Sequence, residues 1–352
     1  MAMKKFVLIS AGLSLLMSVA VSLSAQELIP FRKGNLWGYA DDQGKIVIEP
    51  RFERTWFFTG DDVARVRQKG LYGYIDRSGK FVVPAKYKEA GDFELGIAAV
   101  REGNRQFCIN LEGNPDECNE SYEDEPYEED LEEAFVTYTD STGLAGLFIE
   151  MTGDTIPEKF NSVVTVSRYF SPQQYQFALV SREGKWGAYN EQGRIIAPVE
   201  FEEVEPLSIS SCKVKKDGLW GVLSRGSKMI IPCAYDSITK FTSIQTENSG
   251  LVRDEFFIVT AKSKSGLFNK TGQIILPVEF DMIGMPTPCN CAIDFVVRKE
   301  NRYGIVDREG KFILPLKYTY AEPFTGADIT LVKDASGREG YVRRDGTEFF
   351  SD

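Results

Sequence analysis

The sequence predicts an all-β protein made of tandem three-stranded antiparallel repeats, arranged as a propeller-like ring or as an open β-superhelical array. Three observations lead to this fold class. A glycine preceded by an aromatic residue recurs along the chain, a second glycine follows it at a fixed distance, and an apolar triplet before a proline closes each copy. No stretch shows the 3.6-residue apolar period of an amphipathic helix.

The repeat is tightly spaced inside a unit and loosely spaced between units. The clearest copies begin at Trp37-Gly38, Tyr72-Gly73, Trp186-Gly187, Trp220-Gly221 and Tyr303-Gly304. Weaker copies place Phe107, Gly146, Gly266 and Gly340 at the glycine position. Successive positions lie 34 to 45 residues apart, so nine units account for nearly all of the chain after residue 25. Units of this size cannot hold a core alone and must share one with their neighbours.

Each unit contains a β-hairpin. In Asp76-Arg77-Ser78-Gly79 the acid can accept hydrogen bonds from the turn backbone and the glycine tolerates a positive φ, which is the pattern of a type I turn closing with a bulge. The return strand is an unbroken apolar triplet, Phe81-Val82-Val83, which predicts a strand covered on both faces. We expect Pro84 to end the pairing, because proline has no N–H to donate.

A third strand precedes each hairpin, as in Val63-Ala64-Arg65-Val66 and Phe295-Val296-Val297. Small sheets that are covered on both faces must stack face to face, either closing radially as blades or winding as an open superhelix. We favour the radial arrangement.

The Gly-x-Trp-Gly core resembles the WG (KWG) repeat family of bacterial proteins. It occurs as Gly184-Lys185-Trp186-Gly187 and Gly218-Leu219-Trp220-Gly221, followed by Asp/Asn-x-x-Gly and a hydrophobic-Pro ending. The resemblance covers residues 30 to 350, although the aromatic residue is missing at Gln106-Phe107, Ala145-Gly146, Ser265-Gly266 and Glu339-Gly340. It implies a propeller-like β-repeat architecture and a role in binding, and it implies no catalytic residues.

The first 25 residues predict an export signal. Lys4 and Lys5 precede an apolar run over residues 6–21, and Ala25 is suited to cleavage before Gln26. The alternative, a short transmembrane anchor, is disfavoured because the run is shorter than the ~20 residues that span a bilayer. We therefore expect an exported protein, periplasmic, at the cell surface or secreted, and not integral to a membrane after cleavage.

The predicted organisation is a signal peptide at 1–25, N-terminal repeats at 26–111, an acidic linker or insertion at 112–135 and C-terminal repeats at 136–352. The stretch 112–133 holds 12 carboxylates and no basic residue. Clustered oxygens suit divalent cations or a basic partner, but the stretch lacks the ligand order of an EF-hand. We interpret it as a solvated linker and as the best candidate for a hinge.

Composition excludes several chemistries. The 352 residues include 41 Lys+Arg, 52 Asp+Glu and no histidine, giving a net charge of −11. Without histidine the chain lacks the commonest general base and metal ligand, and its acidic balance argues against a nucleic-acid partner. No phosphate-binding, dinucleotide-binding or nucleophile-elbow motif is present. We predict no catalytic residue, no cofactor and no metal site.

The six cysteines fall into three local groups: Cys108 with Cys118, Cys212 with Cys233, and Cys289 with Cys291. Export permits disulfides, and Cys108 and Cys118 are the pair for which we consider a bridge possible. Cys289 and Cys291 span too short a loop for relaxed disulfide geometry. The alternative is that all six act as small buried hydrophobes.

The repeat aromatics Trp37, Trp186 and Trp220 are interpreted as packing anchors between units, so that Trp186→Ala would cost on the order of 3–5 kcal/mol. The alternative is that they line a surface on which sugars stack.

The leading functional prediction is an exported, non-enzymatic repeat protein that offers a scaffold surface to a protein of the cell envelope. A carbohydrate-binding module is the first alternative. A glycoside hydrolase is the second, because that chemistry needs only two carboxylates.

Overall fold

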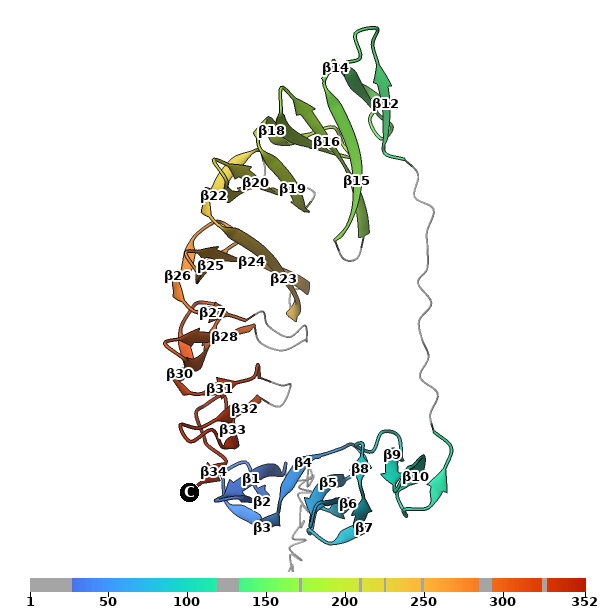
Figure 1. The fold of residues 1–352 in the computed structure, drawn as a ribbon, viewed down its shortest axis with the longest axis vertical. Helices are drawn as coiled ribbons and strands as arrows, with labels where there is room; N and C mark the ends of the chain where they lie inside the picture. The colour runs from blue at the N-terminus through green and yellow to red at the C-terminus, as the bar shows by residue number, and fades with distance from the viewer. Residues whose placement is uncertain are drawn as a thin grey trace, which may run out of the picture. The chain divides into compact units, whose positions relative to one another are not determined.

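The computed structural model describes residues 27–118, 133–170, 173–208, 211–224, 226–247, 250–284, 293–324 and 328–352. Every regular element in these residues is a β-strand, which confirms the all-β class (Figure 1). The predicted signal peptide lies outside the described residues. The described residues form two compact units: the first holds residues 27–30 and Leu36–Asp116, and the second holds Phe31–Asn35 and the described residues from Glu117 to Asp352.

Three small sheets hold the strands up to residue 116, each with its strands in chain order. Their strands are β1 (Ile29–Lys33), β2 (Leu36–Ala40) and β3 (Ile46–Phe52); β4 (Arg54–Phe58), β5 (Val63–Gln68), β6 (Leu71–Asp76) and β7 (Phe81–Tyr87); β8 (Glu89–Ala90), β9 (Ile97–Glu102), β10 (Arg105–Asn110) and β11 (Pro115–Asp116).

The second unit contains six sheets with the same internal order. Their strands are β12 (Phe135–Thr139), β13 (Ala145–Ile149) and β14 (Asp154–Phe160); β15 (Ser162–Phe170), β16 (Gln173–Arg182), β17 (Lys185–Asn190) and β18 (Ile195–Phe201); β19 (Glu203–Ser208), β20 (Ser211–Lys216), β21 (Leu219–Ser224) and β22 (Lys228–Tyr235); β23 (Ser237–Glu247), β24 (Gly250–Ala261), β25 (Lys264–Asn269) and β26 (Ile274–Phe280); β27 (Met282–Ile283), β28 (Asp294–Lys299), β29 (Arg302–Asp307) and β30 (Phe312–Tyr318); β31 (Tyr320–Ala321), β32 (Ile329–Lys333) and β33 (Glu339–Arg343). The last strand, β34 (Phe350–Ser351), pairs in parallel with Arg32 and Lys33.

A complete sheet has four antiparallel strands, one more than the repeat pattern predicts. The three predicted strands are its second, third and fourth, and an additional first strand begins just after the aromatic residue that follows the proline. This first strand has no common sequence pattern, and its length varies from 2 residues in β27 to 11 in β23. The repeat signal therefore did not reveal it.

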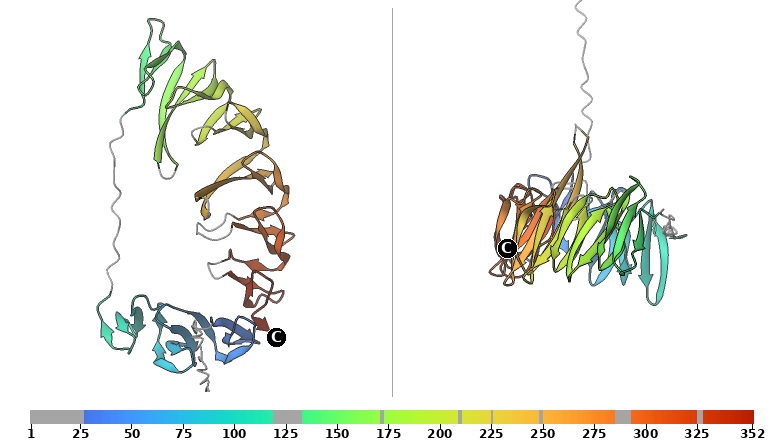
Figure 2. Two further views of the ribbon diagram at one scale, coloured as in Figure 1. Left: turned by 180° about the vertical axis from the view of Figure 1, so that it is seen from behind. Right: turned by 90° about the horizontal axis from the view of Figure 1, so that it is seen from above.

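The sheets of the second unit stack face to face in chain order, as predicted for small sheets of this kind. First strands lie along the inner side of the curved row and fourth strands along its outer side (Figures 1 and 2). Each interface is a shared core: Phe257 and Val259 of β24, for example, pack with Val222 and Ile231 of the preceding sheet. Because each sheet completes the core of its neighbour, no sheet in the row is an independent folding unit.

The predicted turns are confirmed at Asp76. The Gly79 amide donates to the Asp76 carbonyl at 2.9 Å, and Gly79 has a φ of 85°. The Asp76 carboxylate accepts from the amides of Ser78 and Lys80 at 2.9 and 3.0 Å. The hydrogen bond from the Ser78 hydroxyl is the main cause of the lowered pKa of Asp76, and these two amides add to it.

We expect Asp76→Ala to lower the free energy of unfolding by about 1 kcal/mol at neutral pH, because two turn amides lose their acceptor. Asp76→Asn should stay near the parent, since Asn269 accepts the same bonds from Thr271 and Gln273 in its own turn.

The same two variants give a pH signature. A carboxylate with a lowered pKa in the folded state stabilises the fold above its unfolded pKa of about 3.9 and loses this effect as the pH falls through the folded value. Asp76→Asn has no such loss. The free energy of unfolding of Asp76→Asn, relative to that of the parent, should therefore be higher at pH 3 than at pH 7 in urea titrations. A deficit of Asp76→Asn that grows on acidification would contradict this explanation.

The proline does not end the pairing, so that prediction is wrong. Pro84 lies inside β7, at a bulge between the Tyr74–Val83 pair and the Tyr72–Tyr87 pair. Between these two pairs β6 advances by two residues and β7 by four. Pro84 is therefore one of the β7 residues that have no partner on β6. A residue in this position needs no ladder N–H, which explains why proline is tolerated there.

The apolar triplets are not covered on both faces, which corrects a second prediction. In four consecutive sheets the third residue of the triplet is buried, while the first is 40–59% exposed. These exposed residues are Ile195, Met229, Ile274 and Phe312. The fourth strand is the outer edge of its sheet, so the adjacent sheet covers the end of the triplet but not its beginning.

Candidate binding surface

The predicted repeat anchors occupy two different environments. Their glycines, Gly38, Gly73, Gly187, Gly221 and Gly304, are all buried. Trp37 is buried as well, but Tyr72, Trp186, Trp220 and Tyr303 are only partly buried. The aromatic residues that fill the cores stand elsewhere in the repeat, at Tyr39 and Tyr74 after the glycine and at Phe52, Tyr87 and Phe201 after the proline.

Three of the partly buried rings each face a cation on the adjacent strand. Arg67, Lys215 and Arg298 stand directly opposite Tyr72, Trp220 and Tyr303 in the strand register. Their charged ends lie 5.7, 5.4 and 5.9 Å from the ring centres. We call these the aromatic–cation pairs. The sequence signal that would have found them is a basic residue five positions before the aromatic residue.

Neighbouring charges support the aromatic–cation pair at Trp220. The Lys215 ammonium lies 2.6 Å from a Glu203 carboxylate oxygen, and the Lys213 ammonium, 2.6 Å from Glu205, lies 4.5 Å from the Trp220 ring centre. A cation over an aromatic face contributes about 0.5–1 kcal/mol at exposed sites. The result is a mixed aromatic and charged surface.

Trp186 carries the revised prediction for the anchor position. Because its side chain is only partly buried, we expect Trp186→Ala to lower the free energy of unfolding by about 1–2 kcal/mol, less than a fully buried aromatic would lose. Trp186→Phe should lose less than half as much. Urea denaturation followed by circular dichroism measures both variants. A loss of about 3–5 kcal/mol for Trp186→Ala would restore the interpretation as a core anchor.

An acidic residue just after the core aromatic has a structural task that sequence reasoning missed. The Glu202 carboxylate accepts from the amides of Asp217 and Gly218 at 3.0 Å each, in the turn between the second and third strands. The Gly218 amide is the main cause of the lowered pKa of Glu202. Glu53 accepts from Gly70 in the same way. The available signal was the acid that directly follows the core aromatic.

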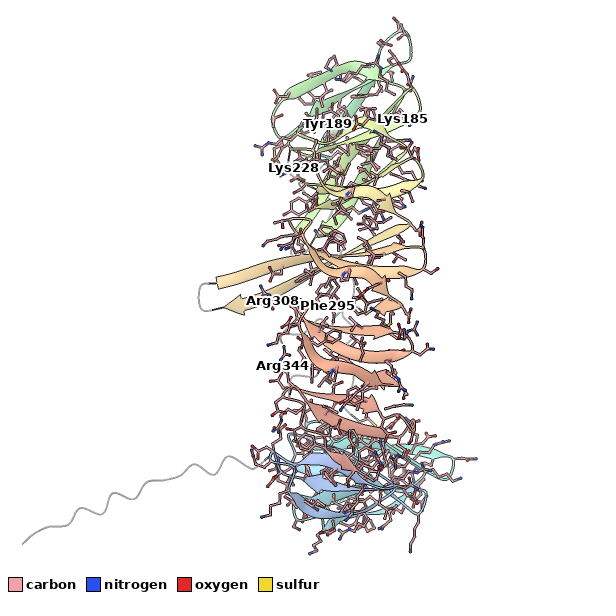
Figure 3. All side chains as sticks on the ribbon, turned by 90° about the vertical axis from the view of Figure 1, so that its left-hand side faces the viewer. Lys185, Tyr189, Lys228, Phe295, Arg308 and Arg344 are labelled. Atoms are coloured by element: carbon pink, nitrogen blue, oxygen red, sulfur yellow. The ribbon has the colours of Figure 1, made fainter. Side chains whose placement is uncertain are left out.

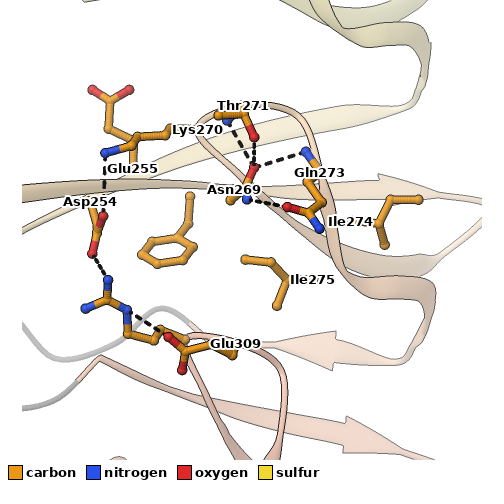
Figure 4. A pocket seen from close by; sticks show the side chains of 11 residues that line it. Asp254, Glu255, Asn269, Lys270, Thr271, Gln273, Ile274, Ile275 and Glu309 are labelled. Carbon is orange, nitrogen blue, oxygen red and sulfur yellow. Dashed lines mark hydrogen bonds and ion pairs between the residues drawn. The ribbon is translucent and has the colours of Figure 1, made fainter.

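A pocket of about 320 Å³ lies where the sheet β23–β26 meets the turn before β30 (Figure 4). Ile274, Ile275 and Phe256 form its apolar part. At its rim the Arg308 guanidinium lies 2.7 Å from one Asp254 carboxylate oxygen, and the Lys270 ammonium lies 3.7 Å from the other. Two cations from different turns thus hold the Asp254 carboxylate, and the Arg308 pair links two sheets at the pocket.

The cysteines present no activated thiol among the described residues. Cys212 and Cys233 are free, and burial raises the pKa of both thiols, so that they are protonated at neutral pH. Cys108 and Cys118 are both disulfide-bonded. Cys289 and Cys291 lie outside the described residues. In the described part of the chain, no group of three or more Cys, Asp or Glu side chains is placed to hold a metal ion.

The predicted acidic linker is described only at its two ends. Pro115 and Asp116 form β11 and pair with Ile109 and Cys108, so this part of the segment belongs to a sheet of the first unit. Phe135 begins β12. Residues 119–132 lie outside the described residues. Among the positions that the structure covers, none forms a helix with the length and apolar character of a membrane span.

Comparison with known proteins identifies the repeat. The family model described as "WG containing repeat" matches six segments, at residues 37–72, 72–105, 186–220, 220–243, 266–293 and 303–334. None of the curated proteins matches the chain.

Two solved structures resemble the chain over nearly its whole length. A eukaryotic initiation factor is 11% identical, with 92% of this chain and 95% of that one covered and a TM-score of 0.38. BamB from Moraxella catarrhalis is 13% identical, with 90% and 96% covered and a TM-score of 0.26. We draw no function from either likeness.

Proposed function

The chain belongs to the WG-repeat family, and from that premise we propose that it is an exported, non-enzymatic protein whose repeat surface binds a protein of the cell envelope. The observation that carries this proposal is the recurrence of the same surface group on separate sheets. Arg67–Tyr72, Lys215–Trp220 and Arg298–Tyr303 are equivalent positions of three repeats. Tyrosine, tryptophan and arginine are the residues enriched at the centres of protein interfaces.

A protein partner is favoured over a glycan because of how these rings are placed. A sugar that stacks on an aromatic side chain needs an open ring face. At Trp220, Lys213 and Lys215 lie 4.5 and 5.4 Å from the ring centre, and at Tyr72 the Arg67 guanidinium carbon lies 5.7 Å from it. Carbohydrate binding is therefore the second candidate.

The proposed lack of catalytic activity is supported by the state of the described carboxylates in the pocket. Asp254 is bound to Arg308 and Lys270, and Glu255 lies 2.7 Å from the Lys240 ammonium. Glycoside hydrolysis requires one carboxyl group to be protonated at the working pH and the other to attack or to activate water. Asp254 and Glu255 are instead held by cations of the chain itself, which assigns them a structural task.

Export is supported by the N-terminal sequence, in which a basic start, an apolar run and Ala25 precede Gln26. Fractionation of the source cells should recover the chain outside the cytoplasm, with Gln26 as its first residue in N-terminal sequencing. Recovery in the cytoplasm with residues 1–25 attached would overturn this part of the proposal.

The binding proposal is tested by affinity isolation of the mature chain from its own envelope extract. We expect one envelope protein to co-purify in every replicate and to be lost when Arg67, Lys215 and Arg298 are all replaced by glutamine. A matched variant with glutamine at Lys69, Lys216 and Lys262 removes the same charge in or directly beside the turns between second and third strands, and it should retain the protein. Isolation of no protein, together with glycan-array binding, would overturn the proposal in favour of carbohydrate binding.

A further inference from the structure

A row of exposed apolar and basic residues runs along the second unit. The apolar members are Ile195, Met229, Ile274 and Phe312, one in each of four consecutive sheets. Each pairs with the third-strand residue two positions after its repeat glycine: Tyr189, Leu223, Phe268 and Val306. The four therefore occupy one structural position, repeated from sheet to sheet along the outer side of the row (Figure 1).

A basic residue directly precedes three of these apolar residues. Arg194, Lys228 and Lys311 are all exposed, and no carboxylate partner is found for any of them in the described part of the chain. Other cations of the same unit are ion-paired, as at Lys213 and Lys240. In a chain with a net charge of −11, these cations without an ion pair are a local feature, although Glu191 and Glu309 stand in the same turns as Arg194 and Lys311. We give the name basic–apolar row to Arg194, Ile195, Lys228, Met229, Ile274, Lys311 and Phe312.

The row lies on the side of the stack that carries the turns between third and fourth strands. In Figure 3, Lys228, Arg308 and Arg344 from three sheets lie along this side, while Lys185 lies on the opposite side. Ile274 also lines the pocket of Figure 4, so the row has an apolar recess along its length.

We propose that the basic–apolar row is the docking site for an acidic polypeptide segment of the partner, bound in an extended conformation. This inference rests on the proposed function and adds a second contact for the same partner, because the aromatic–cation pairs lie at the other ends of their strands, beside the turns between second and third strands. Each of the four sheets offers one exposed apolar side chain, and three of them offer a cation directly before it. An extended chain without internal hydrogen bonds can follow such a row over several sheets. The segment would carry apolar residues along its length, with Asp or Glu beside them.

A polypeptide fits the row better than a lipid surface does. The apolar side chains are 40–59% exposed, so about half of each is embedded in its own sheet and does not project. Insertion at a bilayer interface requires apolar groups that reach ~5–10 Å into the headgroup region. A narrow polypeptide can contact side chains at this level, and its carboxylates can pair with Arg194, Lys228 and Lys311.

The test uses a fluorescent peptide of four Leu-Pro-Glu repeats, with binding to the mature chain followed by fluorescence anisotropy at about 0.05 M ionic strength. We expect saturable binding that falls at least tenfold in the triple variant Arg194→Gln, Lys228→Gln and Lys311→Gln.

The matched control is the triple variant Lys185→Gln, Lys216→Gln and Lys262→Gln, which removes the same charge in or directly beside the turns between second and third strands. It should change binding less than twofold. Equal losses in the two triple variants would show general charge attraction and overturn the proposal.

A second peptide tests the apolar contacts. A peptide with serine in place of every leucine should bind at least tenfold more weakly than the first. Ile274→Ser should weaken binding of the first peptide without changing the melting temperature, because Ile274 is 59% exposed. Equal affinity for the two peptides would show that the apolar row makes no contact and would overturn the proposal.

The remaining outcomes separate this inference from the proposed function. If vesicles of anionic phosphatidylglycerol bind the parent and not the Arg194, Lys228 and Lys311 variant, while the peptide does not bind, the row is a lipid site and the proposal fails. If that variant still co-purifies with the envelope protein, the inference fails although the proposed function holds. Loss of the protein from this variant, with its retention by the matched control, supports both.

Discussion

Alanine at Gly73 is expected to lower the free energy of unfolding by about 3 kcal/mol or more, or to prevent the first unit from folding. A Cβ atom at this position would lie 2.6 Å from the Ala85 nitrogen and 2.7 Å from the Val83 carbonyl oxygen. Both are backbone atoms of the bulge in β7, so no side-chain rotation can relieve the overlap. The strands β6 and β7 would have to separate at this point. Urea denaturation and the melting temperature measure the loss.

Gly60 provides the matched control. It lies in the turn before β5, and a Cβ atom there would meet no heavy atom within 4 Å. Gly60→Ala should therefore change the free energy of unfolding by less than about 0.5 kcal/mol. The reduced entropy of the unfolded chain favours folding in both alanine variants, so it cannot account for a loss. Similar free energies of unfolding for the two variants would show that the close approach of β7 does not constrain Gly73.

The position of the repeat glycine can be predicted from the sequence, but the reason for it cannot. At Gly187, Gly221 and Gly304 a Cβ atom would lie 2.7–2.8 Å from the carbonyl oxygen of the residue just before the proline. This approach exists only because the proline continues the strand through a bulge. Local pattern reasoning treats proline as a stop, since it lacks an N–H, and so it separates two residues that the fold brings together.

Burial could be predicted within a strand but not between sheets. The turn at Asp76 and the second to fourth strands follow from offsets inside one repeat, where each interaction joins residues close in sequence. The exposure of Ile195, Met229 and Phe312, and the partial burial of Trp186, depend on how far the adjacent sheet extends over each position. No offset within one repeat contains that information.

The basic–apolar row shows the same limit for the candidate site. The sequence places Lys228 before Met229 and Lys311 before Phe312, and each pair is visible in the printed chain. Their significance rests on two facts that only the fold supplies: they occupy the same place on their respective sheets, and the cations have no carboxylate partner among the described residues.

Ion pairs between sheets are a further feature that the repeat pattern does not contain. The Arg308 guanidinium reaches back to Asp254, and Arg344 reaches back to Asp294. Both arginines stand four positions after the repeat glycine, in the turn that follows the third strand. Each therefore ties its own sheet to the preceding one at the edge of their shared core.

The Asp294–Arg344 pair is the more buried of the two ion pairs. We expect a large loss of stability when one of its partners is removed. The Asp294 side chain is 4% exposed, against 29% for Arg344. Arg344 donates to both carboxylate oxygens, with Nη2 at 2.8 Å from Oδ1. Removing one partner of a buried pair costs about 3–5 kcal/mol, because the other charge is left buried without compensation.

The difference in exposure makes the two single substitutions unequal. Arg344→Ala leaves the more buried charge without its partner, so we expect the larger loss, about 3–5 kcal/mol at pH 7. Asp294→Ala leaves a guanidinium that can turn toward solvent, and its loss should be smaller. The double variant should be no less stable than Arg344→Ala alone, which a double-mutant cycle measured by urea denaturation would show. Additive losses would contradict the pairing.

Arg344 also packs on an aromatic ring, since its guanidinium carbon lies 5.5 Å from the centre of Phe324. The pH dependence of Arg344→Ala tells whether the lost stability comes from the ion pair or from this packing contact. Burial raises the pKa of Asp294, and without the guanidinium its carboxyl group takes up a proton more readily in the folded state than in the unfolded chain. A carboxyl group whose folded pKa is raised destabilises the fold while it is charged, and this penalty is relieved as the pH falls toward the folded pKa. The deficit of Arg344→Ala relative to the parent should therefore be smaller at pH 5 than at pH 8, whereas a deficit from packing alone would be the same at both.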